Sequence, residues 1–202
     1  MYKDKLRFSV SNFINPTRYI DLDLNTLDYT IVWQDKVSNF NPANYEKTFT
    51  YYESKDGTMV PLTYFHRKDL EINAETPIFL YGYGGYNISI RPSFSRKYVG
   101  WLELGGVVAI ANLRGGGELG KKWHNAGRLK EKQNVFDDFL YASKYLEANN
   151  VGNRKSTVIS GRSNGGLLVG TSLVQNPNYF GATLPAVGVL DMLPVSYTHL
   201  TL

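Results

Sequence analysis

The sequence predicts an α/β fold whose sheet is mostly parallel and carries helices on both faces. From residue 77 onward, short apolar runs alternate with helical patterns or long connections, an order that is typical of a parallel sheet. The runs at residues 77–81 and 106–111 are apolar at nearly every position, as expected for strands buried on both faces. In such sheets, sites form beyond the carboxyl ends of the strands, so we expect the functional residues in the loops that follow these runs.

The chain before residue 77 is predicted to form antiparallel hairpins. Apolar and polar residues alternate over residues 20–24 and again over residues 29–33, with a turn between them, and this period of two indicates a hairpin with one solvated face. A second hairpin is expected over residues 47–66, closing at a turn in which Gly57 adopts a positive φ. Two or three strands within residues 1–45 are too few to be stable alone, so we expect them to need a partner that this chain does not contain.

Helices and one more strand are expected after the second buried run. Over residues 134–149 the apolar side chains recur on one stripe, which predicts an amphipathic helix. A further helix is expected to begin at Asn164 and to end at Asn176 and Pro177. Residues 182–189 are predicted to form one more buried strand.

Residues 158–168 contain a motif that indicates a function. A β-branched run ends in G-x-S-x-G at residues 161–165, and a helical pattern follows. This is the sequence of a nucleophile elbow, a sharp strand-to-helix turn that places a serine at its apex in strained backbone angles. Ser163 is therefore the candidate nucleophile. The alternative is a glycine-rich connection between a strand and a helix that has no activity.

A serine nucleophile needs hydrogen-bond donors for the oxyanion that forms on attack. One donor is usually the backbone N–H of the next residue, which here is Asn164. The loop at residues 82–87 follows an earlier strand and offers a second donor, from its amides or from the hydroxyl of Tyr83. The alternative for Tyr83 is an aromatic ring that packs under the sheet.

The nucleophile also needs a base and an orienting carboxylate, which normally follow the serine in the order acid, then histidine. After Ser163 only Asp191 and His199 are available, and no strand or helix lies between them to bring both to the upper edge of the sheet. His66 and His124 precede the serine, against the usual order, and His124 is interpreted as a packed or capping histidine. Arg162 is interpreted as a surface or ion-pair residue.

Composition argues against several other classes of protein. The 202 residues carry a net charge of only +4 and 43% hydrophobic residues, so we expect one ordinary globular domain with a real core and no nucleic-acid or membrane partner. The densest basic cluster is interpreted as a solvated face; it comprises Lys121, Lys122, Arg128, Lys130 and Lys132. The glycine-rich segment at 114–122 lacks phosphate-loop spacing, and no residues have metal-ligand spacing, so we expect no cofactor. The lack of cysteine fits a cytoplasmic or periplasmic location.

Several motifs, in order, resemble the prolyl oligopeptidase family, from about residue 6 to residue 193. They are YGYGGYNISI at 81–90, ANLRGGGE at 111–118, WH at 123–124, KQN at 132–134, FDDF at 136–139 and GRSNGGLL at 161–168. The resemblance implies an α/β-hydrolase domain capped by a seven-bladed β-propeller, and cleavage of short peptides after proline. It implies that residues 1–45 are the end of a propeller and that residues 46–193 are the N-terminal part of the hydrolase domain.

The same resemblance implies roles for five residues. Ser163 is similar to the family's nucleophile, Tyr83 to the tyrosine that completes the oxyanion hole, and Asn164 to the residue whose amide is the other donor. Tyr86 and Val189 fall where the family lines its proline pocket, although phenylalanine is commoner at the position of Tyr86. The sister branch that cuts after basic residues usually has alanine in place of Asn164, so we expect proline specificity.

The resemblance also implies that the chain is a truncated piece of a monomeric serine peptidase that works through an acyl-enzyme. The family's catalytic aspartate and histidine are not matched in this sequence, and residues 194–202 resemble a non-native tail. We therefore expect the chain alone to be inactive. Two alternatives are an esterase, which would share the elbow and the oxyanion donors, and a non-catalytic binding module linked to a propeller.

Overall fold

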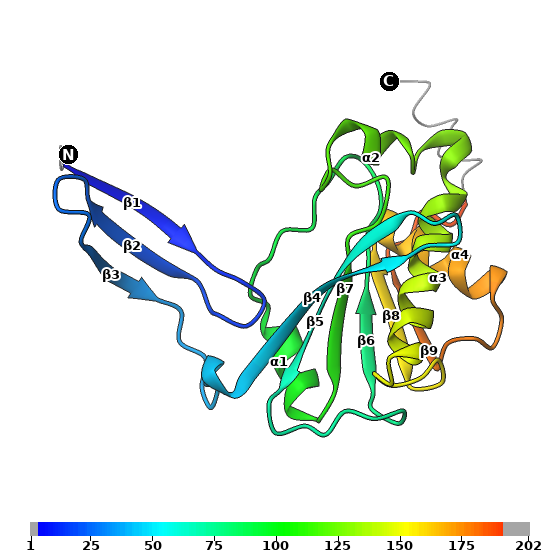
Figure 1. Ribbon diagram of the computed structural model, residues 1–202, viewed down its shortest axis with the longest axis horizontal. Helices are drawn as coiled ribbons and strands as arrows, with labels where there is room; N and C mark the ends of the chain where they lie inside the picture. The colour runs from blue at the N-terminus through cyan, green and yellow to red at the C-terminus, as the bar shows by residue number, and fades with distance from the viewer. Residues whose placement is uncertain (1–3, 192–202) are drawn as a thin grey trace.

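The computed structural model describes residues 4–191 and contains two β-sheets (Figure 1). The smaller sheet is antiparallel in the order β1-β2-β3, and the larger sheet has the order β4-β5-β7-β6-β8-β9. The predicted α/β class is therefore confirmed. The predicted tail at residues 194–202, including His199, lies outside the described residues.

The small sheet confirms the predicted N-terminal hairpin, but its solvation differs from the prediction. It is formed by β1 (Lys5–Val10), β2 (Arg18–Asp23) and β3 (Tyr29–Gln34). Every residue of β3 is exposed, so this strand has two solvated faces in the described chain rather than one. The sheet extends away from the larger one (Figure 1). The loop after β1 anchors it, because Phe13 is buried and stacks on Phe65 with ring centroids 5.4 Å apart.

The predicted hairpin at residues 47–66 is present and forms one edge of the large sheet. Its strands are β4 (Tyr45–Glu53) and β5 (Met59–Arg67), which pair antiparallel. Gly57 in the connecting turn has a φ of 82°, a value at which a glycine has no Cβ to clash. Because β5 also pairs antiparallel with β7, the hairpin converts the parallel sheet into a mixed one.

The remaining strands are parallel, as predicted. They are β6 (Ile78–Tyr81), β7 (Val107–Ala111), β8 (Thr157–Arg162) and β9 (Ala182–Ala186). All five residues of β7 are buried, in agreement with its apolar run. The expectation that the last strand is buried is wrong: β9 pairs only with β8 at the edge of the sheet, and four of its five residues are exposed.

Helices cover both faces of the large sheet. On one face α3 (Gln133–Ala148) and α4 (Asn164–Gln175) pack against a core that includes Leu80 and Ile159. On the other face α1 (Arg96–Glu103) packs against Val108 and Ile110. The helices predicted at 134–149 and from 164 onward are confirmed. The structure adds α1 and α2 (Lys121–Asn125), which the sequence did not predict, and the short 3-10 turns η1 (Pro42–Asn44) and η2 (Leu129–Glu131).

A buried ion pair fixes the glycine-rich loop that follows β7. The side chain of Asp138 on α3 is fully buried and pairs with Arg114, whose side chain is 4% exposed. The Nη2 of Arg114 lies 2.6 Å from Asp138 Oδ1, and its Nε lies 3.0 Å from Oδ2. Ser54 and Asp56 from the β4–β5 hairpin also bond to this pair. Three segments far apart in the sequence are thereby held together beneath the loops at the carboxyl ends of the strands.

Candidate active site

Ser163 lies at the junction between β8 and α4, in a backbone conformation that side chains rarely adopt. Its φ is 57° and its ψ is −119°, outside the small left-handed region that residues other than glycine occupy. The glycines of G-x-S-x-G are required by close approach: a Cβ on Gly161 would lie 2.0 Å from Gly165 O, and one on Gly165 would lie 2.8 Å from Gly82 O. The geometry of the elbow is thus that expected from the sequence.

Backbone hydrogen bonds hold Ser163 while its side chain stays exposed. Its N–H donates to Ala186 O at 2.9 Å, and its carbonyl accepts from the N–H groups of Gly166 and Leu167 in the first turn of α4. Within residues 4–191 no group forms a hydrogen bond with its hydroxyl. Asn164 is the first residue of α4, so its N–H has no carbonyl partner within the helix. The exposed hydroxyl of Ser163 and the backbone N–H of Asn164, which has no partner within the helix, therefore belong to adjacent residues.

The loop at residues 82–87 packs against the elbow, as predicted from the neighbouring strand ends. β6 and β8 pair directly, with Tyr81 opposite Ser160, so the segments that follow them lie side by side. The Nδ2 of Asn164 donates to Tyr83 O at 2.6 Å. Tyr83 is half-buried and belongs to neither buried core cluster, which does not support the alternative that it packs under the sheet.

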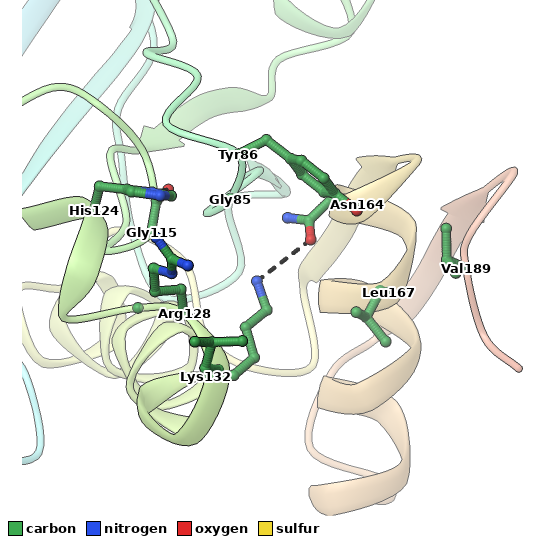
Figure 2. Close-up of a pocket in the computed structure, with 11 residues that line it drawn as sticks. Gly85, Tyr86, Gly115, His124, Arg128, Lys132, Asn164, Leu167 and Val189 are labelled. Carbon is green, nitrogen blue, oxygen red and sulfur yellow. Dashed lines mark hydrogen bonds between the residues drawn. The ribbon is translucent and has the colours of Figure 1, made fainter. Parts of the chain in front are cut away.

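Lys132 lies at this junction, and its place differs from the prediction for the basic cluster. Lys121, Lys122, Arg128 and Lys130 are exposed as expected, but the Nζ of Lys132 donates to Gly84 O at 2.7 Å and to Asn164 Oδ1 at 3.3 Å (Figure 2). Burial lowers the pKa of Lys132 to about 8. The interpretation of this residue as part of a solvated face is wrong, because the ammonium is turned into the contact between the loop and the elbow.

A pocket of about 770 Å³ opens beside the elbow (Figure 2). Three of the residues carried over from the family resemblance line it, namely Tyr86, Asn164 and Val189. Ser163 and Tyr83 do not line it; the pocket reaches the elbow through Asn164 and Leu167. The opposite wall comes from the glycine-rich loop, from α2 and from the segment that follows α2, none of which was predicted to line the site. Its residues are Gly115, His124, Gly127, Arg128, Leu129 and Lys132.

The histidines of the described chain do not serve Ser163 as partners. His124 lines the pocket, and its Nδ1 lies 2.7 Å from Gly115 O, which fits its interpretation as a packed histidine and makes Nδ1 the protonated nitrogen. His66 is buried on β5 with its Nδ1 2.8 Å from Arg67 O. Arg162 and Asp191 are exposed. Any base and carboxylate for Ser163 therefore lie outside residues 4–191 or require rearrangement within them.

No group of three or more His, Cys, Asp or Glu side chains within residues 4–191 could hold a metal ion. In that part of the chain no helix is both long and apolar enough to cross a membrane.

Comparison with known proteins gives a consistent set of relatives. A prolyl endopeptidase of Elizabethkingia meningoseptica is 43% identical over 188 residues, which are 93% of this chain and 26% of that protein. A prolyl endopeptidase of Dictyostelium discoideum is 38% identical over 195 residues, 95% of this chain and 26% of that protein. The chain thus spans about a quarter of the length of the curated relatives it matches.

Solved structures agree with the sequence comparison. One prolyl endopeptidase is 44% identical with a TM-score of 0.88, covering 94% of this chain and 28% of that one. Prolyl oligopeptidase B of Galerina marginata, solved with a 25mer macrocyclization substrate, is 36% identical with a TM-score of 0.89, covering 94% and 27%. The model of the family described as the prolyl oligopeptidase family matches residues 92–201, more than half of the chain. This chain therefore belongs to the prolyl oligopeptidase family.

Proposed function

We propose that this chain carries the nucleophile of a serine peptidase that cleaves short peptides on the carboxyl side of proline. The observation that carries the proposal is the backbone of Ser163, whose φ of 57° at a strand-to-helix junction coincides with an exposed side chain. Strain of this kind persists where the surrounding structure imposes it, and it clusters at active sites. The relatives named prolyl endopeptidases support the choice of substrate.

In the proposed mechanism, the hydroxyl of Ser163 attacks the carbonyl carbon of the substrate's proline residue, and a histidine takes the proton of the hydroxyl. The oxyanion then accepts hydrogen bonds from the N–H of Asn164 and the hydroxyl of Tyr83, each worth orders of magnitude in rate. Collapse of the tetrahedral intermediate expels the amine, which takes the proton from the histidine, and leaves an acyl-enzyme on Ser163. Water, activated by the same histidine, releases the acid. In this proposal the histidine and its aspartate come from the remainder of a longer protein that contains this chain.

The pocket beside the elbow is the proposed place for the substrate. Its volume of about 770 Å³ is in the range of sites that enclose small ligands, and Tyr86 and Val189 on its wall offer the apolar surface that a prolyl ring requires. Residues 1–45 are proposed to be the end of a β-propeller, and residues 46–193 the N-terminal part of an α/β-hydrolase domain. The exposed faces of β3 and the exposed edge strand β9 support this division, because both surfaces lack a partner within the described chain.

The test uses a longer protein that contains this chain together with the chain itself. We expect the longer protein to turn over a chromogenic Gly-Pro substrate and to react with a fluorophosphonate, and the variant Ser163→Ala to do neither. We expect the 202-residue chain alone to show no turnover, because loss of the base costs orders of magnitude in rate. Turnover by the chain alone that Ser163→Ala abolishes would contradict the proposed origin of the base.

Two outcomes of the same assays would replace the proposal. Faster turnover of a short-chain ester than of the Gly-Pro substrate, with both activities lost in Ser163→Ala, would identify an esterase. A longer protein that neither reacts with the fluorophosphonate nor turns over either substrate would identify a non-catalytic binding module.

A further inference from the structure

We propose that Lys132 is a positioning residue for the proposed peptidase site, and that it fastens the loop bearing Tyr83 to the elbow bearing Ser163. This inference rests on the proposed function, and it adds a residue that neither the elbow motif nor the oxyanion donors include. Lys132 touches no reacting atom in the proposed mechanism. It acts through the backbone of the loop and through the side chain of Asn164.

Three hydrogen bonds join the two segments in one chain of donors and acceptors. The Nδ2 of Asn164 donates to Tyr83 O at 2.6 Å, and the Nζ of Lys132 donates to Gly84 O at 2.7 Å and to Asn164 Oδ1 at 3.3 Å. An ammonium group has donors only, so it requires the oxygen of the Asn164 amide to face it. The amide nitrogen must then face Tyr83 O. Lys132 thus sets which way Asn164 points, and both hold consecutive carbonyls of the loop.

The backbone of the loop at residues 82–87 is strained. Gly84, Tyr86 and Asn87 all have positive φ values, of 61°, 54° and 56°, and residues other than glycine persist in such conformations only where their surroundings impose them. The loop also approaches the elbow too closely for a side chain at residue 85, because a Cβ there would lie 2.5 Å from the Nδ2 of Asn164. A fastening at Gly84 O therefore fixes the loop between Tyr83, which provides the proposed donor, and Tyr86, which lines the pocket.

Lys132 differs from the other basic residues of its cluster, because it is partly buried and its burial is not compensated by an ion pair among the described residues. No carboxylate in the described part of the chain forms an ion pair with it, and the ionisable side chains that share the pocket are Tyr86, His124 and Arg128. Its ammonium lies 5.9 Å from the centroid of the Phe136 ring. Desolvating an unpaired ammonium is unfavourable, so its burial here is explained by the two oxygens that it holds.

Because the hydrogen bonds of Lys132 position the loop that bears Tyr83, losing them should weaken the proposed oxyanion donor. Removing an oxyanion donor costs about 100- to 1,000-fold in kcat, and we expect Tyr83→Phe to fall in that range. Displacing a donor costs less, so Lys132→Met is expected to lower kcat by about 10- to 100-fold. KM should change by no more than about threefold, because the apolar surface of the pocket is intact. Lys132→Arg retains the charge and the donors and should recover most of the lost activity.

The experiment is a double-mutant cycle in a longer protein that contains this chain, assayed with the chromogenic Gly-Pro substrate. If Lys132 acts through Tyr83, Lys132→Met costs much less in the Tyr83→Phe background than in the wild type. The matched control is Lys130→Met, two residues away and exposed, which should leave kcat unchanged. Equal losses in both backgrounds, or a wild-type kcat in Lys132→Met, would overturn the inference.

A second measurement does not require activity. Hydrogen exchange of the amides at residues 84–88 should accelerate in Lys132→Met and not in Lys130→Met, because the loop loses one of its attachments. If the wild-type protein turns over no substrate, the proposed function fails, and exchange alone decides whether Lys132 holds the loop. Unchanged exchange in Lys132→Met refutes the fastening. If Lys132→Met does not fold, Lys132→Gln, which keeps one donor, is measured instead with the same expectations.

Discussion

Replacing Asp138 by alanine should destabilise the protein strongly, because it breaks a buried ion pair. The carboxylate is fully buried, and it accepts from the Nε, the Nη2 and the backbone N–H of Arg114 and from the hydroxyl of Ser54. Removing the carboxylate takes away the acceptor of all four donors at a place where they are buried. Breaking a buried ion pair in this way costs about 3–5 kcal/mol.

Asp56 provides a matched comparison, because it bonds to the same guanidinium from the surface. Its side chain is 46% exposed, so after Asp56→Ala water can replace the lost carboxylate. Exposed ion pairs contribute about 0.2–1 kcal/mol, and we expect Asp56→Ala to cost about 1 kcal/mol. The two variants remove the same chemical group from the same partner, and the difference between them measures burial.

The assay is urea denaturation followed by circular dichroism, with the free energy of unfolding extrapolated to water. Asp138→Ala should lower that free energy by at least about 2 kcal/mol more than Asp56→Ala. The double variant Arg114→Met, Asp138→Leu should regain part of the loss, because an apolar pair removes the unmatched charge. Equal losses in the two single variants would show that Asp138 is not desolvated as the structure indicates.

Three further predictions use the elbow and its neighbours. Ser163→Gly should raise the free energy of unfolding by about 1–2 kcal/mol over Ser163→Ala, since only glycine accepts a φ of 57° and a ψ of −119° without strain; equal stabilities would contradict the strain. Gly165→Ala should cost about 1–3 kcal/mol because its Cβ would lie 2.8 Å from Gly82 O, whereas Gly100→Ala in α1 meets no atom within 4 Å and should stabilise by up to about 1 kcal/mol. Burial lowers the pKa of Lys132 from 10.5 to about 8, so between these values the unfolded chain binds a proton that the folded protein has released. Urea denaturation at about pH 7 and about pH 10 should therefore show the wild type gaining stability relative to Lys132→Met as the pH rises; a relative loss would refute the direction.

Much of the sheet was predictable from local sequence alone. The run at 106–111 became β7, in which every residue is buried, because a strand with neighbours on both sides and helices on both faces has no solvated surface. The hairpin at 47–66 was predictable from different signals, namely the alternation of apolar and polar residues and a glycine in the turn, and both of these signals are local. The elbow was predictable because its motif is contiguous over residues 161–165 and Gly161 is required by a local contact with Gly165 O, whereas the contact that requires Gly165, with Gly82 O, is distant in sequence.

The elements that were missed depend on contacts distant in sequence. Helix α1 has Gly100 in its middle, with two aromatic residues and a valine near it, which is a poor helix signal. It forms because Tyr98 and Leu102 are buried against the sheet. The exposure of β9 could not be predicted from its apolar sequence, because exposure depends on whether another strand pairs with its free edge. Lys132 looked like its exposed neighbours, and only the fold brings it to Gly84 O and Asn164.

Several unfavourable features of this chain lie close together. Three other residues with positive φ that are not glycine, Asn39, Asn150 and Asn178, lie in turns, where asparagine is tolerated. Ser163 has a ψ that this explanation does not cover. The strained loop at 82–87 and the desolvated Lys132 both form hydrogen bonds with its neighbour Asn164. A strand-to-helix connection needs none of these costs, so their coincidence supports the proposed site. In that proposal a hydroxyl, an amide and a second donor are held at fixed positions before substrate arrives.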